Sequence, residues 1–365
     1  MRLVVFGLTI SSSWGNGHAT LWRGLCRALA ADGHHVTFFE RDVPYYAQAR
    51  DMWDAPGGSL ILYQRWQAVE ERARAALERA DAAIVTSYCP DAPAATDLLR
   101  EFALLKLFYD LDTPVTLAAI ARGEEVPHIG ARGLEEFDLV LSFTGGPVLD
   151  ALKSLGARRA LPLYGHADPE HHRPCTPCPA YRADLSYLGT YAADRQPALE
   201  ELFVAPARAR RQARFLLGGA QYPDDFPWSE NIYFVRHMPP EQHPAFFCSS
   251  RLTLNVTRRD MRAMGWCPSG RLFEAAACGA PLVSDAWDGL DRFFEPGKEI
   301  LLAHSRDDVL AALDTDEDAL REMAGRARTR LLAEHSSQHR ARELIGLIAD
   351  APSPRRQTVL AGAVS

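Results

Sequence analysis

Residues 265–285 read GWCPSGRLFEAAACGAPLVSD, and this stretch contains the signals for both ends of a helix. Ser269 predicts the start, because a serine hydroxyl accepts hydrogen bonds from the free N–H groups of a first helical turn. Gly279 predicts the end, since glycine is favoured just past a helix C-terminus. Leu282, Val283 and Ser284 then predict a short buried strand. The stretch is therefore expected to be one helix–strand unit of an α/β fold.

A charged residue on this predicted helix indicates a binding site. The helix start near Ser269 and Gly270 presents backbone N–H groups and the positive end of the helix dipole, which suit a phosphate or diphosphate. Glu274 lies four residues after Gly270, on the same face and about one turn (~6 Å) further along. A carboxylate there can accept hydrogen bonds from both hydroxyls of a ribose. The alternative is a buried glutamate that forms an ion pair with an arginine: Arg258, Arg259 or Arg271.

Length and composition limit the class of protein. A chain of 365 residues suggests two domains of ordinary size. The net charge of −7 argues against a nucleic-acid surface, which needs a positive excess. Seven scattered cysteines favour reduced thiols and a cytoplasmic location. No apolar run reaches the ~18 residues of a membrane span, so we expect no integral membrane segment; the N-terminal apolar run is interpreted as a buried strand, because no cleavage motif follows it.

The first half of the chain alternates between predicted strands and helices. The apolar run 4–10 and the segment 34–40 are expected to be strands of a parallel sheet, joined by an amphipathic helix over 19–31. The loop 11–18 then lies at the carboxyl edge of that sheet, where open α/β folds bind ligands. Residues 60–79 predict one charged amphipathic helix. Further strands are expected at 82–86, 104–109, 137–143 and 161–164, and the second half repeats the alternation from residue 185 onward.

Two groups of residues raise the question of a metal. Asp110 and Asp112 lie at i and i+2 on an extended segment and could chelate Mg²⁺; their alternative role is to cap the turn and the helix that follows. A proline-rich segment carries a second set of possible ligands, which favours a solvated linker over a zinc site because its CxxC has no second pair: His166, His171, His172, Cys175 and Cys178. We expect no metal at either place.

Three segments carry a family resemblance: FYDLDTPVTL (108–117), LSFTGGPVLDAL (141–152) and TRRDMRAMGWCPSGRLFEAAACGAP (257–281). The last resembles the donor-site motif of retaining GT-B glycosyltransferases, in which a glutamate binds the ribose of a nucleotide sugar. Together the three are similar to the spore maturation protein CgeB-like glycosyltransferases. The chain departs from the wider retaining family at Trp266, where those proteins have a second glutamate that touches the sugar.

The resemblance implies a fold and an activity. The fold is expected to be α/β of the GT-B type, with two Rossmann-like domains facing across a cleft. The expected division is an acceptor-side domain 1–165, a linker 166–183, a donor-binding domain 184–335, a helix 336–350 that returns to the first domain, and a tail 351–365. The expected activity moves a sugar from a nucleotide-diphosphate sugar to a glycan, protein or small-molecule acceptor, with retention and without a cofactor. The sequence leaves the sugar, the base, the acceptor and the oligomeric state open.

The resemblance also implies site residues. The residues expected to bind the donor are Glu274, Ser269, Gly270, Arg271, Arg258, Arg195, Thr190, Tyr191, His237 and Met238. Those expected on the acceptor side are Gly15, Asn16, Gly17, Thr144, Gly145 and Gly146. Those expected to act in catalysis are Asp110, His18 and Asp112.

Other functions fit the same architecture. A nucleotide-sugar epimerase would convert the donor without an acceptor. A phosphorylase would need a lysine-bound pyridoxal cofactor, and none of the three lysines lies in such a setting. A catalytically degenerate protein would bind a nucleotide sugar without turnover, and the tryptophan at position 266 is the feature that favours this alternative.

Overall fold

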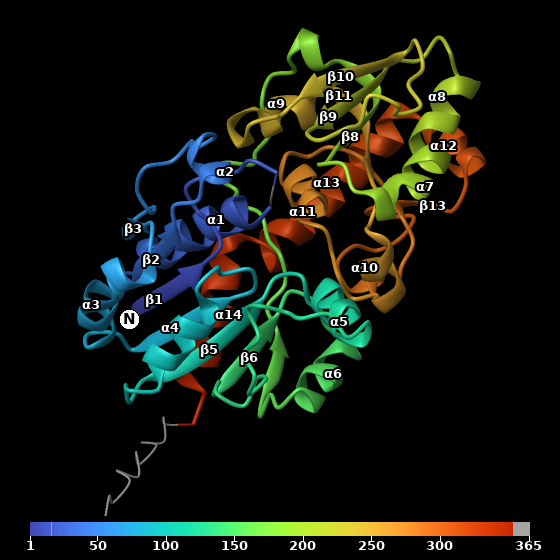
Figure 1. The fold of residues 1–365 in the computed structure, drawn as a ribbon. Helices are drawn as coiled ribbons and strands as arrows, with labels where there is room; N and C mark the ends of the chain where they lie inside the picture. Colours follow the sequence, from blue (N-terminus) through green and yellow to red (C-terminus); the bar gives the residue numbers. More distant parts are fainter. Residues whose placement is uncertain (16, 353–365) are drawn as a thin grey trace, which may run out of the picture.

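The computed structural model describes residues 1–15 and 17–352, which form two α/β lobes (Figure 1). The first lobe is built on a seven-stranded sheet of order β3-β2-β1-β4-β5-β6-β7. Every strand pairing in it is parallel. Its elements are β1 (Arg2–Gly7), α1 (His18–Ala31), β2 (His35–Arg41), α2 (Pro44–Ala47), β3 (Ser59–Tyr63), α3 (Trp66–Leu77), β4 (Ala82–Thr86), α4 (Ala92–Leu99), β5 (Leu105–Asp110), α5 (Thr113–Ala121), β6 (Leu139–Ser142), α6 (Val148–Ser154) and β7 (Ala160–Pro162).

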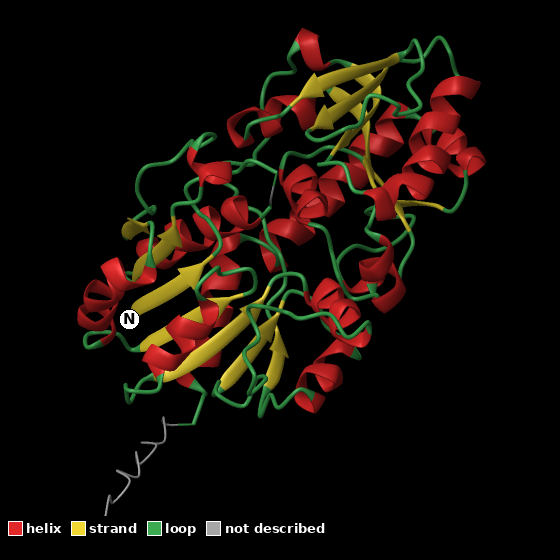
Figure 2. Cartoon of the chain, in the orientation of Figure 1, coloured by secondary structure: helices red, strands yellow, loops and turns green. Residues whose placement is uncertain are grey.

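The second lobe is built on a six-stranded parallel sheet of order β10-β9-β8-β11-β12-β13. Helices flank both sheets (Figure 2). The α and β elements from residue 183 onward are β8 (Ala183–Leu188), α7 (Gln196–Leu199), α8 (Ala205–Ala209), β9 (Phe215–Gly219), β10 (Ile232–Arg236), α9 (His243–Cys248), β11 (Ser250–Asn255), α10 (Arg259–Met264), α11 (Gly270–Ala277), β12 (Leu282–Asp285), β13 (Leu301–Ala303), α12 (Arg306–Leu313), α13 (Glu317–Glu334) and α14 (Ser337–Ala349). Short helical turns lie at Pro179–Tyr181, Ala193–Arg195, Glu200–Val204, Pro240–Gln242 and Leu290–Arg292.

The central strands of both sheets are buried on both faces, as their continuous apolar sequences predict, whereas the edge strand β10 is largely exposed. Successive residues of β1 alternate between two separate cores: Val5 packs in one, and Val4 and Phe6 pack in the other. The last helix, α14, contributes Leu344 to the first of these cores, beside Trp22 of α1. The end of the described chain therefore packs on the first lobe rather than on the second.

One local prediction is wrong, and one short helix was not predicted. The single helix predicted over 60–79 is instead the strand β3 followed by α3. The apolar run at 60–63 pairs with β2 as an edge strand, and this tertiary pairing decides its conformation. The short helix α10 was not predicted, because its sequence RDMRAM lacks an apolar stripe of any length. No helix of the described chain is both long and apolar enough to cross a membrane.

The two lobes are in contact through Trp266. Its backbone carbonyl accepts a 3.0 Å hydrogen bond from the N–H of Gly145 in the first lobe. Its ring lies between Gly146 and Gly289, where an added Cβ would come within 2.5 Å of the ring at either glycine. Beside it, the hydroxyl of Thr144 donates to Sγ of Cys267 over 3.0 Å. Glycine is therefore required on both sides of this tryptophan.

Replacing Gly146 by alanine tests this contact. Gly146 has φ of +63°, so a side chain costs roughly 1–2 kcal/mol of backbone strain, and the Cβ also meets the Trp266 ring. Gly123 is a matched control, because its φ is +73° and an added Cβ would meet nothing within 4 Å. We expect Gly146→Ala to lower the free energy of unfolding in urea clearly more than Gly123→Ala does. Equal losses would show that the contact with Trp266 contributes nothing.

Candidate active site between the lobes

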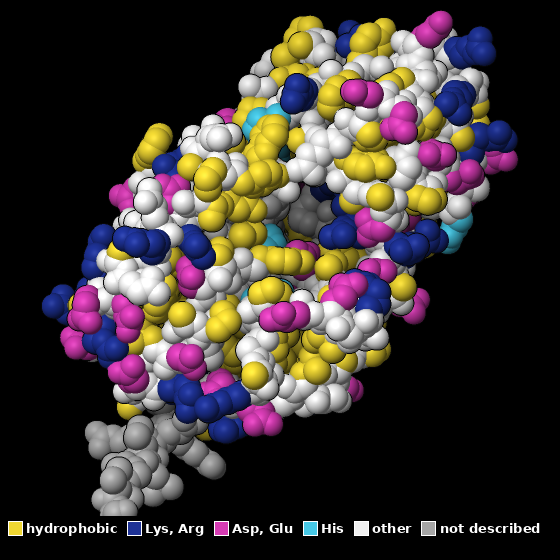
Figure 3. Space-filling model, viewed as in Figure 1, with side chains coloured by type: hydrophobic (Ala, Val, Ile, Leu, Met, Phe, Trp, Pro, Cys, Tyr) yellow, Lys and Arg dark blue, Asp and Glu magenta, His cyan; other side chains and the backbone are white. Residues whose placement is uncertain are grey.

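A cavity of about 530 Å³ lies between the two lobes. Figure 3 shows the surface hollowed at this place. The segments that follow β1, β5, β8, β9 and β11 line the cavity, together with the start of α11. Because the strands within each sheet are parallel, their carboxyl ends lie at one edge, and both sheets turn that edge toward the cavity. The fold therefore places loops from distant parts of the sequence around one space.

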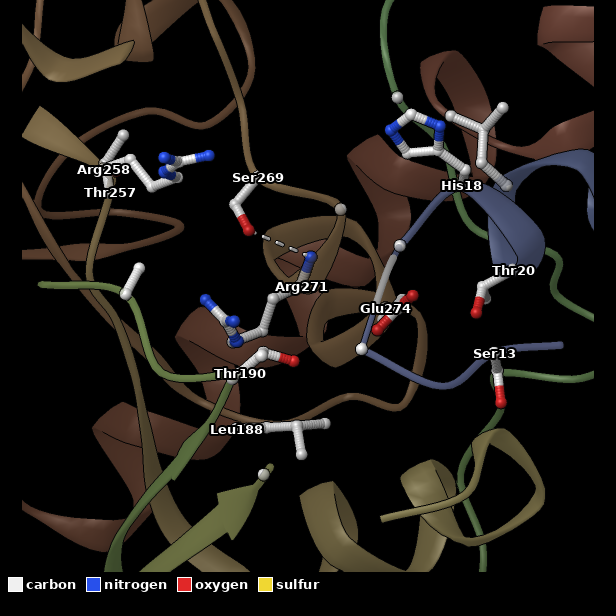
Figure 4. Close-up of a pocket in the computed structure, with 18 of the residues that line it drawn as sticks. Ser13, His18, Thr20, Leu188, Thr190, Thr257, Arg258, Ser269, Arg271 and Glu274 are labelled. Carbon is white, nitrogen blue, oxygen red and sulfur yellow. Dashed lines mark hydrogen bonds between the residues drawn. The ribbon is translucent and has the colours of Figure 1, made fainter. Parts of the chain in front are cut away.

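The helix α11 brings its start and one carboxylate to this cavity. The Oγ of Ser269 accepts a 3.3 Å hydrogen bond from the N–H of Arg271, so Ser269 is the N-cap. On the face turned away, Leu272 and Phe273 are fully buried in the core of the second lobe. Ser269, Gly270 and Glu274 all line the cavity. Figure 4 shows Glu274 between the labelled residues of the two lobes.

Glu274 is held as a carboxylate by its surroundings. Burial alone would raise the pKa of Glu274, but His172, His243 and Arg271 stabilise its charged form and lower this pKa to about 2. The nearest charged partner is His243, whose Nδ1 lies 3.5 Å from Oε2. Within the described chain no ion pair joins Glu274 to Arg258 or Arg259. Of the three arginines considered as partners of Glu274, Arg271 alone is among the groups that lower its pKa, and it acts through its charge without a direct ion pair.

Two arginines of the cavity lining lie together near the start of α11. Arg271 donates to Oδ1 of Asn255 over 3.1 Å and its guanidinium lies 5.0 Å from the ring centroid of Tyr187. Arg195 donates to the hydroxyl of Tyr187 over 2.8 Å. Burial lowers the pKa of Arg271, and the positive charge of Arg195 acts in the same direction. The Nε–H of each has no acceptor among the described residues, so the pair is suited to an anion.

Gly189 provides the room for these arginines. A Cβ at Gly189 would lie 2.7 Å from Arg271 and 3.0 Å from Arg195. A third arginine, Arg258, lines the cavity and pairs with Asp194 over 3.1 Å. Its neighbour Arg259 has a side chain that is 77% exposed, so the two adjacent arginines do not act as one clamp.

The first lobe contributes a histidine–aspartate pair. His18 is the first residue of α1 and its Nε2 lies 3.3 Å from Oδ2 of Asp112, which follows β5. Both residues line the cavity. Asp110 does not line it, because its side chain is fully buried and accepts a 3.1 Å hydrogen bond from the N–H of Asp112. Asp110 therefore supports the turn that carries Asp112, and the two carboxylates do not form an exposed chelating pair.

The structure brings most of the predicted site residues to the cavity. Those that line it are His18, Asp112, Glu274, Ser269, Gly270, Arg271, Arg258, Arg195, Thr190, Tyr191, His237, Met238, Gly15 and Gly17. Four predicted residues do not: Asp110 is buried beneath it, and Thr144, Gly145 and Gly146 lie at the contact with Trp266 and Cys267. Asn16 lies outside the described residues.

The predicted linker does not form the zinc site considered from its sequence. His166 is hydrogen-bonded to the Ser337 hydroxyl over 2.8 Å, and the Nε2–H of His171 donates to the carbonyl of Pro240 over 2.9 Å. The N–H of Cys178 donates to Oγ of Ser249 over 2.7 Å. Among the described residues, one group has the spacing to hold a metal ion: His172, His243 and Glu274.

Sequence reasoning missed two buried carboxylates that shape the cavity. Glu40 at the end of β2 accepts hydrogen bonds from the backbone N–H groups of Ile10 and Ser11, over 2.7 and 2.9 Å. Asp285 at the end of β12 accepts bonds from the N–H and the hydroxyl of Thr257. Each fixes the loop after a neighbouring strand. The available signal was an acidic residue at the end of an otherwise apolar predicted strand, where burial requires partners.

Residues 195–346 match a family model described as glycosyl transferase-like. No curated protein matches the chain. Among solved structures, a sucrose-phosphate synthase from Thermosynechococcus elongatus superimposes with a TM-score of 0.69 at 16% identity, covering 95% of this chain and 98% of that one. The fold is GT-B.

Two other GT-B neighbours have bound nucleotides in their structures. Anabaena HepE in complex with UDP-glucose gives a TM-score of 0.66 at 13% identity, covering 96% of this chain and 99% of that one. A mutant of the T4 phage protein BGT in complex with UDP-glucose gives a TM-score of 0.58 at 12% identity, covering 96% of this chain and 100% of that one. At these identities the likeness concerns the fold, and it confirms the prediction of two Rossmann-like halves. The GT-B neighbours are matched over nearly their whole length.

Asp110 provides a test of the buried turn beneath the cavity. Burial raises the pKa of Asp110 to about 6 from the ordinary value of 3.8. The folded protein therefore binds this proton more tightly than the unfolded chain does, and stability is lost as pH rises from about 4 through 6. Asp110→Asn cannot ionise, so it should gain roughly 2–3 kcal/mol relative to wild type between pH 4 and pH 7 in urea unfolding. Asp150→Asn, at a side chain 82% exposed, is the control. A difference for Asp110→Asn that stays constant with pH would contradict the account.

Proposed function

We propose that the protein is a glycosyltransferase that moves a sugar from a nucleoside diphosphate sugar to an acceptor hydroxyl. The observation that carries the proposal is the arrangement on α11: a carboxylate and an N-capped helix start line one cavity about a turn apart, with Arg195 and Arg271 beside them. Such an element can hold a ribose diol and a diphosphate at the same time. The glycosyl transferase-like match over 195–346 supports this proposal.

The finer assignment rests on the sequence resemblance and on the GT-B neighbours. The motifs around Asp110, Gly145 and Glu274 resemble the CgeB-like glycosyltransferases. Two GT-B neighbours were solved with UDP-glucose, so we propose a hexose donor of this general class. As the leaving diphosphate gains charge, Arg195, Arg271 and the helix start would stabilise it. The cavity lies between the lobes, so closure would exclude water and limit donor hydrolysis.

The acceptor is proposed to lie against the first lobe. His18 and Asp112 line that side of the cavity and can orient an acceptor hydroxyl by hydrogen bonds. If the reaction proceeds with retention, as we propose, the leaving phosphate takes the acceptor proton. The 3.3 Å contact between His18 and Asp112 also fits a general base, and that route would give inversion.

Trp266 bears on the alternative of a protein that binds but does not react. Its ring packs between Gly146 and Gly289 and does not line the cavity. The position that holds an acidic sugar contact in the wider retaining family is thus used for a contact between lobes. The sugar must then be held by other groups, and turnover is compatible with this tryptophan.

Loss of the Glu274 carboxylate should weaken nucleotide binding. We expect Glu274→Ala to lower the affinity for the cognate donor about 10- to 100-fold, because a charged group gives up hydrogen bonds to the ribose. A panel of nucleotide sugars and nucleoside diphosphates is compared by thermal shift on wild type and variant. Asp291→Ala, an exposed residue of the same lobe, is the control. Equal shifts for wild type and Glu274→Ala would assign Glu274 to structure.

Removal of His18 should affect transfer and leave donor binding unchanged. We expect His18→Ala to lower the turnover number for sugar transfer about 100-fold or more, since an oriented proton acceptor or hydrogen-bond partner is lost. The donor affinity should stay within a factor of about two, because α11 and the arginines are untouched. The anomeric configuration of the product, read by NMR, separates retention from inversion. Conversion of the donor without an acceptor would indicate an epimerase, and binding without any product would indicate a degenerate protein.

A further inference from the structure

His172 is a buried histidine with no visible partner. It lies in the segment between the two sheets, and its side chain is 2% exposed. Neither Nδ1 nor Nε2 makes a hydrogen bond to any part of the chain that the structure describes. A buried polar group without a hydrogen-bond partner is energetically costly, and a ligand bound to this imidazole would offset that cost. The backbone holds it in place, because the His172 N–H donates to the Asp168 carbonyl over 2.7 Å and Asp168 is paired with Arg27.

His243 presents a second nitrogen to the same point. Its Nε2 lies 3.3 Å from the carbonyl of Met238, and a carbonyl only accepts, so Nε2 carries the proton. If His243 is neutral, its Nδ1 carries no proton and presents a lone pair. This Nδ1 is buried without a hydrogen bond and faces Oε2 of Glu274 across 3.5 Å. With a neutral His243 two acceptors would face each other there, an unfavourable arrangement that either a proton or a metal cation between them relieves.

The three side chains converge from separate elements. His172 comes from residues 163–182, the interlobe segment between β7 and β8. His243 comes from the first turn of α9, and Glu274 from the middle of α11. One ligand atom of each lies within 4.8 Å of the others. In a tetrahedral zinc site the ligand atoms are about 3.4 Å apart, so the 3.5 Å between His243 and Glu274 already matches. The ligand atom of His172 would need to move inward by at most about 1.4 Å, since it lies within 4.8 Å of the other two.

We propose that His172, His243 and Glu274 bind one zinc ion, with the fourth position open toward the cavity. Two imidazoles and a carboxylate suit zinc and its first-row neighbours, whereas Mg²⁺ and Ca²⁺ prefer oxygen ligands. The Met238 carbonyl holds the outer nitrogen of His243, as outer-shell groups do for metal-bound histidines. The open position follows from the lining of the cavity, which includes His243 and Glu274 but not His172.

The site has a consequence for the neighbouring helices. A zinc ion would tie the interlobe segment to α9 and α11 at a single point. A carboxylate has lone pairs on both oxygens, so Glu274 can contact the ion and still accept a hydroxyl from the cavity. The ion would thus fix the orientation of Glu274. The proposal does not rest on the proposed transferase activity, since metal binding needs no sugar donor.

A protonated His243 is the simpler alternative, and the structure offers a way to separate the two. Protonation of Nδ1 would make an ordinary ion pair with Glu274, but it would leave both nitrogens of His172 without partners in the described chain. A thiolate site is a second alternative, because the N–H of Cys175 lies 3.4 Å from Sγ of Cys248. The three models therefore differ in the effect of changing His172 and Cys175.

The test measures zinc binding by the full-length protein. After treatment with a chelator and its removal, zinc is added back and bound metal is counted by mass spectrometry. We expect about one ion per chain. His172→Ala should lower zinc affinity about 100-fold or more. The matched control is His171→Ala, the adjacent histidine, which donates to Pro240 and should bind zinc as wild type does. Cys175→Ser should also leave binding unchanged.

Cobalt(II) spectra provide a second measure of metal binding. A second ligand variant keeps the test decisive if His172→Ala does not fold. Cobalt at this site should give visible d–d bands without the near-ultraviolet band of a thiolate ligand. If His172→Ala is unstable by circular dichroism, His243→Gln removes a ligand from the helix end and should lose the same bands. The proposal is overturned if the wild-type chain binds less than about one tenth of an equivalent of zinc. It is also overturned if His171→Ala loses as much affinity as His172→Ala, or if a thiolate band appears.

Discussion

Glu274 keeps a negative charge inside the protein, and the rest of the site depends on how this charge is balanced. The Glu274 side chain on α11 is mostly buried, and burial alone would raise its pKa and favour the neutral acid. Histidines from two other segments and Arg271 of its own helix offset that cost. The helix must therefore stand at a meeting point of three segments. That requirement places the carboxylate, the helix start and the arginines around one cavity.

In both lobes a buried carboxylate holds a loop that borders the cavity. Parallel strands bring their ends to one edge, but the loops that follow must still be held against water and against each other. In each lobe a buried acid does this: Glu40 accepts backbone bonds from the loop after β1, and Asp285 accepts them from the segment after β11. Trp266 then joins the lobes between two glycines. The cavity is thus shaped by buried polar contacts, while the apolar cores supply the layers behind it.

Local signals predicted the parts of the structure that local interactions decide. Ser269 caps α11 through its own hydroxyl, and Gly279 ends that helix with a φ of +71°, so both were readable from the sequence. Tertiary contacts decided the rest. Residues 60–63 form a strand because they pair with β2. Asp110 is buried beneath the turn that carries Asp112, whose N–H donates to its carboxylate. The approach of His172 to His243 joins residues 71 positions apart and had no local signal.

A crystal structure of the protein with a bound nucleoside diphosphate is the most direct test of the central claim. The account predicts the diphosphate at the start of α11, near Arg195 and Arg271, and the ribose hydroxyls within about 3 Å of the Glu274 carboxylate. A nucleotide bound outside the cavity, or one whose ribose lies away from Glu274, would contradict it.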